Sequence, residues 1–307
     1  MENQGWLWVT ASLSVYFLDI LLRLFHRNFV QYDITNVNKL PGNVCQITFI
    51  SSAPKHNLIT KPGQYILLQC SKISSLEWHP FTITSVDSDS SQTSFNVLMR
   101  MRGDWTKMVC RMINFKKENS ILPSTHVPIR LLVDGPFCSP LESSIHCRVA
   151  VCIAGGIGIT PFMALLNFLG KNNTSHLSRP HRIHLVWVVQ RCSHLKWAKH
   201  LISNVHVKFW SQNQPDRLQV SLFVTKDYSL EAVQEILVDD CKFLLRRVSA
   251  GRPCWHEIFS EWANIYNKKE VNIFLCGPES LTKQVKQECD KYNQRGCSFR
   301  CVIETFS

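Results

Sequence analysis

The stretch VAVCIAGGIGITPF, residues 149–162, decides the fold of the second half of this chain. Its apolar start, residues 149–153, is typical of a buried parallel strand, and the apolar run at residues 162–169 predicts a helix. The glycines between them therefore lie in a strand-to-helix turn, where a backbone without Cβ atoms can approach a ligand closely. Free N–H groups at the helix start suit a pyrophosphate, although a tight connection without a ligand fits this stretch equally well. The candidate binding residues of the turn are Gly155, Gly156, Gly158, Thr160 and Pro161.

Strand-like and helical segments alternate after residue 149. The strand-like segments at residues 184–189, 218–224 and 271–276 are separated by helical stretches. This alternation indicates a parallel sheet with crossover helices.

The segment before residue 149 contains short strands instead. Residues 44–50, 64–70 and 95–101 have strand patterns, and turn signals such as Lys61-Pro62-Gly63 separate them. Strands at this spacing without helical patterns predict a small antiparallel barrel. A chain of 307 residues is also longer than a single hydrophobic core usually accommodates, which favours two domains. We therefore expect an antiparallel β-barrel domain at residues 28–140 and a parallel-sheet α/β domain at residues 145–307.

Three short strings stand in the order that flavin-to-nicotinamide electron transfer requires. They are HPFTIT at residues 79–84, AGGIGITPF at residues 154–162 and FLCGP at residues 274–278. With DGPF at residues 134–137, they resemble the dehydrogenase half of the NADPH oxidase family, which belongs to the ferredoxin-reductase-like superfamily of flavoproteins. The resemblance runs from about Trp6 to Ser307 and also includes PGQYI at residues 62–66, GDWT at residues 103–106 and GRPCW at residues 251–255. The ending ETFS and the stretch KFWSQNQPD at residues 208–216 are most similar to the type-four NADPH oxidases.

The resemblance implies an FAD site on the barrel. The HPFT string would hold the flavin, and the GDWT string would bring a helix start to the FAD pyrophosphate. Without the resemblance, the HPFT string fits the end of a strand with core packing, and Trp105 fits the anchor of a surface helix. The candidate FAD-binding residues are His79, Pro80, Phe81, Thr82, Gly103, Trp105 and Thr106.

The resemblance also implies an NADPH site on the α/β domain, with the glycine turn at the pyrophosphate. Cys276, Gly277 and Pro278 resemble the turn beside the nicotinamide ring, although Cys276 also fits a buried strand cysteine. The terminal aromatic Phe306 would stack on the flavin face and move aside before hydride passes, so Cys276 and Phe306 are the candidate catalytic residues. No protein acid or base is expected, because the two cofactors carry the chemistry.

Two positions depart from the family pattern. Cys138 stands after Gly-Pro-Phe, where relatives have glycine, and its Cβ occupies space that a close approach of the backbone needs. Gln190 stands where relatives have the arginine that pairs with the 2′-phosphate of NADPH, and Arg191 follows it. A one-residue shift turns a strand side chain to the opposite face. Arg191 and Arg252 are therefore both candidates for the 2′-phosphate.

The N-terminal segment of the chain has the composition of a membrane helix. Residues 5–25 are mostly apolar and would span about 31 Å as a helix, close to the hydrocarbon thickness of a bilayer. Arg23, His26 and Arg27 form a positive flank, which predicts that the rest of the chain is cytoplasmic. We therefore expect a transmembrane helix and its flank at residues 1–27, with Asp19 as a polar exception. In the family this stretch corresponds to the last membrane helix.

Members of the family carry electrons across the membrane through two haems, each held by a pair of histidines on membrane helices. This stretch offers only His26 near its end. The resemblance therefore implies hydride transfer from NADPH to FAD, then single electrons to a haem and to oxygen, giving superoxide or hydrogen peroxide in the complete enzyme. The haem would be bound by helices or a subunit outside this chain, which is expected to be a fragment or a short form. A small membrane subunit is a further candidate partner.

Two other functions remain open at this point. A ferric or cupric metalloreductase has the same architecture, but the GDWT and GRPCW strings and Phe306 disfavour it. A non-catalytic, membrane-tethered interaction module is favoured by Cys138 and Gln190.

Composition agrees with a cytoplasmic enzyme near a membrane. The formal net charge of +11 favours binding of a polyanionic dinucleotide and contact with an acidic inner membrane leaflet. No basic run interleaves with aromatic residues, so the sequence does not indicate nucleic-acid binding. The thirteen cysteines are scattered without a C-x-x-C pair, so we expect reduced thiols and no metal site. Cys297 and Cys301 lie in a segment that is typical of a strand.

Overall fold

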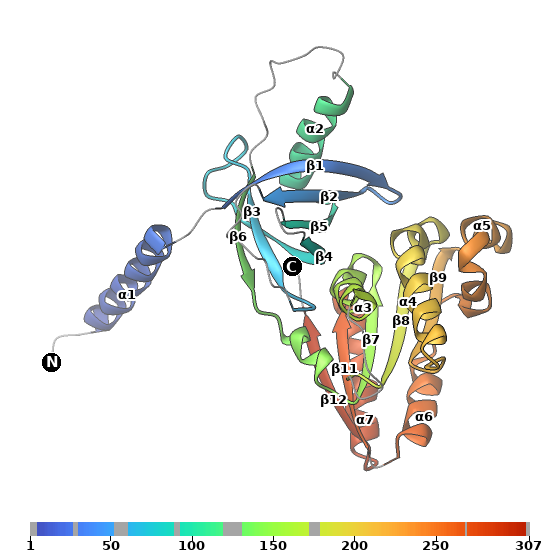
Figure 1. Ribbon diagram of the computed structural model, residues 1–307. Coiled ribbons are helices and arrows are strands. Elements are labelled where there is room, and N and C mark those ends of the chain that lie inside the picture. The colour runs from blue at the N-terminus through green and yellow to red at the C-terminus, as the bar shows by residue number, and fades with distance from the viewer. Residues whose placement is uncertain are drawn as a thin grey trace.

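The chain forms two domains that follow an N-terminal helix (Figure 1). The computed structural model describes residues 5–26, 30–51, 61–88, 93–118, 131–171, 179–267 and 269–304. Helix α1 (Gly5–His26) stands apart from both domains. Its apolar side chains are exposed, with Trp8 at 78% and Val15 at 68%.

The first domain is a closed barrel with the strand order β1-β2-β5-β4-β3-β6, in which every recorded pair is antiparallel. The strands are β1 (Val30–Leu40), β2 (Val44–Ser51), β3 (Tyr65–Gln69), β4 (His79–Ser88), β5 (Thr93–Arg100) and β6 (Leu131–Phe137). Alternate residues of β5 point inward, as the two-residue period of a strand requires. Helix α2 (Asp104–Glu118) adds Trp105, Val109 and Ile113 to the barrel core. The predicted antiparallel barrel is confirmed.

The second domain contains a six-stranded sheet with the order β10-β9-β8-β7-β11-β12, and all its pairs are parallel. The strands are β7 (Val149–Gly155), β8 (Arg182–Arg191), β9 (Leu218–Asp227), β10 (Val248–Ala250), β11 (Glu270–Cys276) and β12 (Ser298–Glu304). The chain builds outward from β7 on one side and returns to add β11 on the other. The crevice outside the carboxyl ends of β7 and β11 is therefore a topological switch point, where open α/β sheets bind ligands.

Helices cover both faces of this sheet. One apolar cluster joins a face of the sheet to α3 (Thr160–Lys171), η3 (Cys192–Trp197), α4 (Lys199–Ser211), α5 (Leu230–Ile236) and η4 (Asp239–Arg247). A second cluster joins the opposite face to α6 (Trp255–Ile265) and α7 (Glu279–Asn293). Two short 3₁₀ segments, η1 (Pro140–Ile145) and η2 (Gly156–Ile159), precede β7 and α3 respectively. The predicted parallel-sheet α/β domain is confirmed.

Helix α3 joins the two domains by running beside β4. Its first residue, Thr160, donates a hydrogen bond from Oγ1 to Oγ1 of Thr82 at 3.4 Å. Further along, Asn167 Nδ2 donates to the Thr84 carbonyl at 2.9 Å. At the helix end Lys171 pairs with Asp87 at 2.5 Å.

A second junction connects η3 with the turn between β1 and β2. The indole N–H of Trp197 donates to the Pro41 carbonyl at 2.8 Å. His194 packs so closely on Gly42 that a Cβ there would lie 2.4 Å from the imidazole Nε2. Gly42 also has φ +78, so this turn requires glycine for its backbone and for its contact. The two junctions hold the barrel against the α/β domain through α3 and η3.

The structure forms a helix at the segment that was expected to span a membrane. Helix α1 is present, but no helix within the described ranges is long and apolar enough to cross a membrane. Asp19 and Arg23 lie inside α1, as do three hydroxyl residues whose side chains donate to backbone carbonyls of the preceding turn. These polar residues lower the mean hydropathy of a segment that looked continuous in sequence. The hydroxyl residues are Thr10, Ser12 and Ser14.

Candidate active site

The glycine turn and the CGP turn pack directly on one another. Strands β7 and β11 are neighbours, and Ala154 pairs in register with Cys276. A Cβ on Gly158 would lie 2.2 Å from the Cys276 carbonyl oxygen, and one on Gly155 would lie 2.5 Å from Cδ of Pro278. Contacts this short exclude any side chain, so the sequence must place glycine at both positions. The structure thus brings together the two strings that were assigned to NADPH.

The outer side of the glycine turn is open. Gly156 has φ +55, and within 4 Å of the position of its Cβ there is no atom of the described chain. The indole N–H of Trp187 donates to the Gly156 carbonyl at 2.9 Å, which holds the turn from the sheet side. Thr160 and Pro161 are buried as the first two residues of α3. A fixed turn with free space outside it fits a dinucleotide pyrophosphate.

The flavin strings also come together. His79, Pro80, Phe81 and Thr82 open strand β4, and the Trp105 ring of α2 lies 4.3 Å from the His79 ring and 6.2 Å from the Phe81 ring. Thr82 is buried and touches Thr160, so the flavin string reaches the glycine turn. Trp105 is 5% exposed, and its Nε1 is a buried donor with no partner in the described part of the chain. Such a donor costs free energy unless a bound group accepts from it, so this position fits a cofactor with acceptor oxygens.

The loop before α2 is held by its own threonine. Thr106 Oγ1 accepts from the Arg102 N–H at 3.2 Å and donates to the Gly103 carbonyl at 2.9 Å. A Cβ on Gly103 would meet nothing within 4 Å in the described chain. The candidate FAD residues Gly103 and Thr106 therefore border open space beside the start of α2, where helix N–H groups lack intrahelical partners.

A cavity of about 160 Å³ lies at the carboxyl edge of the sheet. Gly155, Gly156 and Pro278 line it together with Gln190 and Arg252. Arg191 is not among its lining residues, and it follows Gln190 in strand β8, where successive side chains point to opposite faces. Of the two arginine candidates for the 2′-phosphate, the structure brings Arg252 to the cavity.

The same cavity receives positive charge from the barrel. Arg100, the last residue of β5, lines it beside His194 and Trp197 of η3. Burial, together with the charges of Arg100 and Arg191, lowers the pKa of His194. The His194 Nδ1 is buried without a partner among the described residues. No sequence pattern indicated His194 as a cavity residue, since only the fold brings η3 to the end of β5.

A second cavity, of about 220 Å³, lies at the opposite edge of the sheet. It is lined by the start of β8 at Arg182 and by the loop before β9, including Asp216 and Arg217. This position is remote from both cofactor turns.

Cys276 is a buried, neutral thiol. It is 3% exposed, and burial, with the charge of Glu304, raises its pKa to about 12. Thiolate is the nucleophilic form of cysteine, and Cys276 is a neutral thiol near neutral pH. Cys276 therefore contributes packing to the site and does not act as a nucleophile.

Glu304 lies beside Cys276 and was not a predicted site residue. The two residues are in register on β12 and β11. Glu304 Oε2 accepts a hydrogen bond from Ser139 Oγ at 2.5 Å, across 165 residues of sequence. Burial raises the pKa of Glu304, and the Ser139 hydrogen bond opposes that shift. This pair ties the last strand to the segment that leaves the barrel, and no short sequence pattern indicates it.

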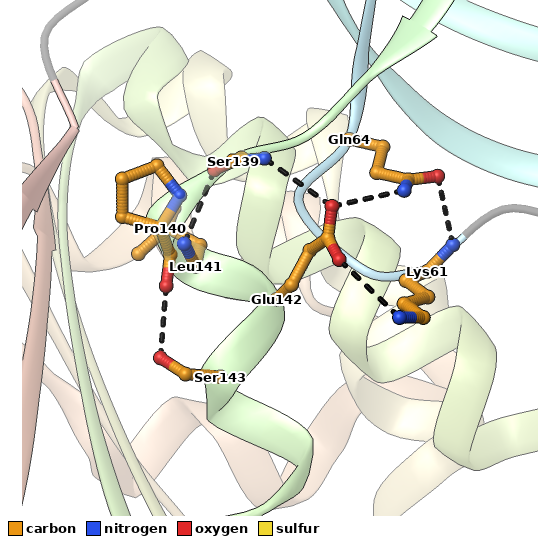
Figure 2. Close-up of polar contacts among 7 residues, drawn as sticks. All are labelled: Lys61, Gln64, Ser139, Pro140, Leu141, Glu142 and Ser143. Atoms are coloured by element: carbon orange, nitrogen blue, oxygen red, sulfur yellow. Dashed lines mark hydrogen bonds and ion pairs between the residues drawn. The ribbon is translucent and has the colours of Figure 1, made fainter.

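The connection between the domains is stabilised by a second carboxylate, Glu142 (Figure 2). Its Oε1 accepts from Gln64 Nε2 at 2.9 Å and from the Ser139 N–H at 3.3 Å, and Lys61 Nζ lies 3.7 Å from Oε2. Burial alone would raise the pKa of Glu142, but the hydrogen bonds from Gln64, Ser139 and Cys138 and the charge of Lys61 lower it. Ser139 and Glu142 form a capping box at the start of η1. Cys138, the departure from the family pattern, is exposed next to this box.

Gly277 and Phe306 are two further candidates from the sequence. Gly277 packs against Gly155, since a Cβ on Gly277 would lie 3.0 Å from the Gly155 Cα. Phe306 lies outside the described residues.

Comparisons with known proteins agree with this geometry. Residues 147–290 match the ferric reductase NAD binding domain, and residues 29–141 match an FAD-binding domain. NADPH oxidase 4 of Homo sapiens is 34% identical over 309 residues, which cover 99% of this chain and 51% of that protein. NADPH oxidase 1 of Mus musculus is 30% identical over 313 residues, which cover 99% of this chain and 50% of that protein. The chain thus spans about half the length of these curated relatives.

Solved structures show the same fold at low identity. The cytochrome b5 reductase domain of Ulva prolifera nitrate reductase matches with a TM-score of 0.59 at 13% identity, covering 90% of this chain and 97% of that chain. The CS-b5R domains of human Ncb5or match with a TM-score of 0.61 at 14% identity, covering 92% of this chain and 70% of that chain.

The fold and the paired turns define a flavin-dependent and nicotinamide-dependent dehydrogenase of the ferric reductase type, with FAD and NADPH as its cofactors. Over almost its whole length the chain is similar to the NADPH oxidases, including the type-four members.

Proposed function

We propose that this chain transfers hydride from NADPH to FAD and passes single electrons to a haem carried outside it. In this proposal residues 28–140 bind FAD and residues 145–307 bind NADPH. The observation that carries it is the packing of Gly158 on the Cys276 carbonyl at the switch point of the sheet, next to the contact between Thr82 and Thr160. Bound flavin and nicotinamide supply the redox chemistry, and the chain supplies their alignment.

The barrel residues hold the flavin in this proposal. Trp105 has a buried indole donor available for a cofactor oxygen, and His79 and Phe81 fix its ring by their contacts. Thr82 orients the flavin toward the glycine turn. Gly103 and Thr106 border the open space where the FAD pyrophosphate would lie, and Pro80 belongs to the β4 segment that holds the flavin.

The α/β residues hold NADPH. Gly155, Gly156 and Gly158 allow the pyrophosphate to approach the backbone, with Thr160 and Pro161 fixing the helix start behind them. Arg252 binds the 2′-phosphate, because it lines the cavity that Arg191 does not reach. Cys276, Gly277 and Pro278 pack beside the nicotinamide, and Phe306 covers the flavin face until NADPH displaces it.

The surroundings of the module are also part of the proposal. The exposed apolar side chains of α1, with Arg23 and His26 in its last turn, favour association with a membrane, with the two domains on its cytoplasmic side. Haem-bearing membrane helices would accept the electrons and pass them to oxygen, which gives superoxide or hydrogen peroxide in a complete oxidase. A small membrane subunit is a proposed further partner.

Anaerobic flavin reduction tests this function. The purified chain is loaded with FAD in detergent and mixed with NADPH under argon, and the flavin absorbance band is followed. We expect the band to bleach, because hydride transfer needs only the two cofactor sites. Bound flavin that keeps its absorbance in excess NADPH would contradict the proposal, and protein that cannot be loaded with FAD would instead support the interaction module.

A further inference from the structure

The last helix and the last strand bring two cysteines together. Cys289 of α7 and Cys301 of β12 both face the apolar layer that covers this side of the sheet, together with Phe299. The Cys289 and Cys301 thiols are close enough for each to shift the pKa of the other. The two thiols are therefore in contact although they come from different elements.

This proximity is fixed by the packing of α7 on β12. Asn293 Nδ2 donates to the Phe299 carbonyl at 2.8 Å, and the Phe299 N–H donates back to Asn293 Oδ1 at 2.7 Å. The Cys289 thiol itself donates to the Phe299 carbonyl at 3.3 Å. Three hydrogen bonds thus hold the start of β12 on the helix that carries Cys289. The packing of α7 on β12 therefore holds the two sulfur atoms near each other without any large backbone movement.

Access by solvent distinguishes this pair from a second one in the barrel. Cys45 and Cys110 also shift the pKa of each other, but they are 0% and 1% exposed, and Cys110 donates to Met99 Sδ at 3.9 Å. Cys301, in contrast, is only partly buried, while its partner Cys289 is 2% exposed. A small solvent-borne oxidant reaches Cys301 first.

We propose that Cys289 and Cys301 are a modification site, at which hydrogen peroxide converts the two thiols into a disulfide. The Cys301 sulfur attacks one peroxide oxygen, the O–O bond breaks, and Cys301 becomes a sulfenic acid as the first water leaves. The Cys289 sulfur then attacks the Cys301 sulfur, the S–O bond breaks and a second water leaves. In sum the thiols lose two hydrogen atoms with their electrons, and one peroxide is reduced to two waters.

The electrostatics around Cys301 favour this order of attack. The hydrogen bond from Cys289 and the charge of Lys286 lower the pKa of Cys301, against burial and the charge of Asp290. Thiolate is the form that reacts with peroxide, and the lower pKa raises its population.

The disulfide would act on the strand that carries Glu304. Strand β12 is the edge of the sheet, and its last described residue is tied to Ser139 beside the cofactor crevice. A covalent link from α7 to β12 closes a short loop and stabilises this edge. The inference rests on the proposed function only for the origin of the peroxide within a complete oxidase.

Peptide mapping tests the inference on the whole purified chain. The protein is treated with added hydrogen peroxide, blocked with iodoacetamide and digested with trypsin without reductant. We expect mass spectrometry to show QECDK, residues 287–291, joined to CVIETFS, residues 301–307, and dithiothreitol to separate them. Cys297 lies in its own peptide, GCSFR at residues 296–300, so a different pairing is seen directly.

Variants separate this site from general oxidation. Cys289→Ser and Cys301→Ser should each abolish the linked peptide, and Cys45→Ser should keep it. Peroxide should raise the midpoint of thermal unfolding by several degrees in the wild type and Cys45→Ser, but not in the other two variants. Absence of the linked peptide from the oxidised wild type, or a link through Cys297, would overturn the proposal. Because the peroxide is added, these outcomes do not depend on whether NADPH bleaches the flavin.

Discussion

Gly158 lies so close to Cys276 that a Cβ on the glycine would come within 2.2 Å of the cysteine carbonyl oxygen. The two residues belong to the turns at the ends of β7 and β11, which the proposed function places at the pyrophosphate and beside the nicotinamide of bound NADPH. The contact between these turns therefore sets the position of the nicotinamide relative to the flavin.

We expect Gly158→Ala to slow flavin reduction by NADPH about 10-fold to 100-fold, because one of the two turns must move and alignment is what the protein supplies. Stopped-flow measurement of the flavin band under argon gives this rate. Gly170→Ala is the matched control: its Cβ would meet only the Val205 side chain, at 3.3 Å, and the rate should stay at the wild-type value. An unchanged rate in Gly158→Ala would mean that this contact does not set the cofactor geometry.

Trp105→Phe should weaken FAD binding about tenfold, because it removes the buried indole donor and keeps most of the ring. Titration of the apoprotein with FAD, followed by flavin fluorescence, measures the dissociation constant. The variant should be at least as stable as the wild type without FAD, since it no longer buries an unpaired N–H. Trp210→Phe, on the exposed side of α4, should leave FAD affinity unchanged, and an equal loss there would count against a specific role of Trp105.

Arg252→Ala should lower kcat/KM for NADPH about 10-fold to 100-fold and leave kcat/KM for NADH nearly unchanged, because only NADPH carries the 2′-phosphate. Arg191→Ala should have the smaller effect, since Arg191 does not line the cavity. Steady-state kinetics with a dye acceptor and both nucleotides measure the two ratios. A larger loss of kcat/KM for NADPH in Arg191→Ala than in Arg252→Ala would show that Arg191 binds the 2′-phosphate.

Glu304 and Glu142 should give opposite pH dependence of stability. The pKa of Glu304 is raised from 4.5, so its protonated form contributes stability that is present below pH 4.5 and lost as the pH rises through the raised pKa. The pKa of Glu142 is lowered from 4.5, so its ionised form contributes stability above that value that is lost as the pH falls through the lowered pKa.

Urea unfolding over a range of pH checks this pair. As the pH rises, the free energy of unfolding of Glu304→Gln should increase relative to the wild type, and that of Glu142→Gln should decrease. A change of the same sign in both variants would show that the two carboxyl groups do not have opposed environments.

Local patterns in the sequence were sufficient for most of the architecture. Residues 149–153 were expected to form a buried parallel strand before a glycine turn, and β7 is buried along its whole length and leads into η2 and α3. The alternation of strands and helices after residue 149 likewise predicted the parallel sheet, because each element buries its own apolar face. Strand β10 was not predicted, since three residues give too short a pattern.

Long-range contacts could not be predicted in the same way. Ser139 and Glu304 are ordinary polar residues in sequence, and their hydrogen bond exists only because β12 is added beside β11. Arg252 lines the cavity and Arg191 does not, and this follows from how the segment after β10 folds back to the sheet, which no local pattern shows. At the N-terminus, a mostly apolar stretch predicted a span, and α1 forms there, although no helix within the described ranges is long and apolar enough to cross a membrane.

The alignment of α3 with β4 limits how this module can be rebuilt. Three polar contacts recur along the two elements, from Thr160 at one end through Asn167 to Lys171 at the other. A single-residue insertion in either element would rotate or slide every later contact out of place. Chimeras that graft a foreign nicotinamide domain onto this barrel must therefore exchange β4 and α3 as a unit, and loops elsewhere are the safer places for length variation.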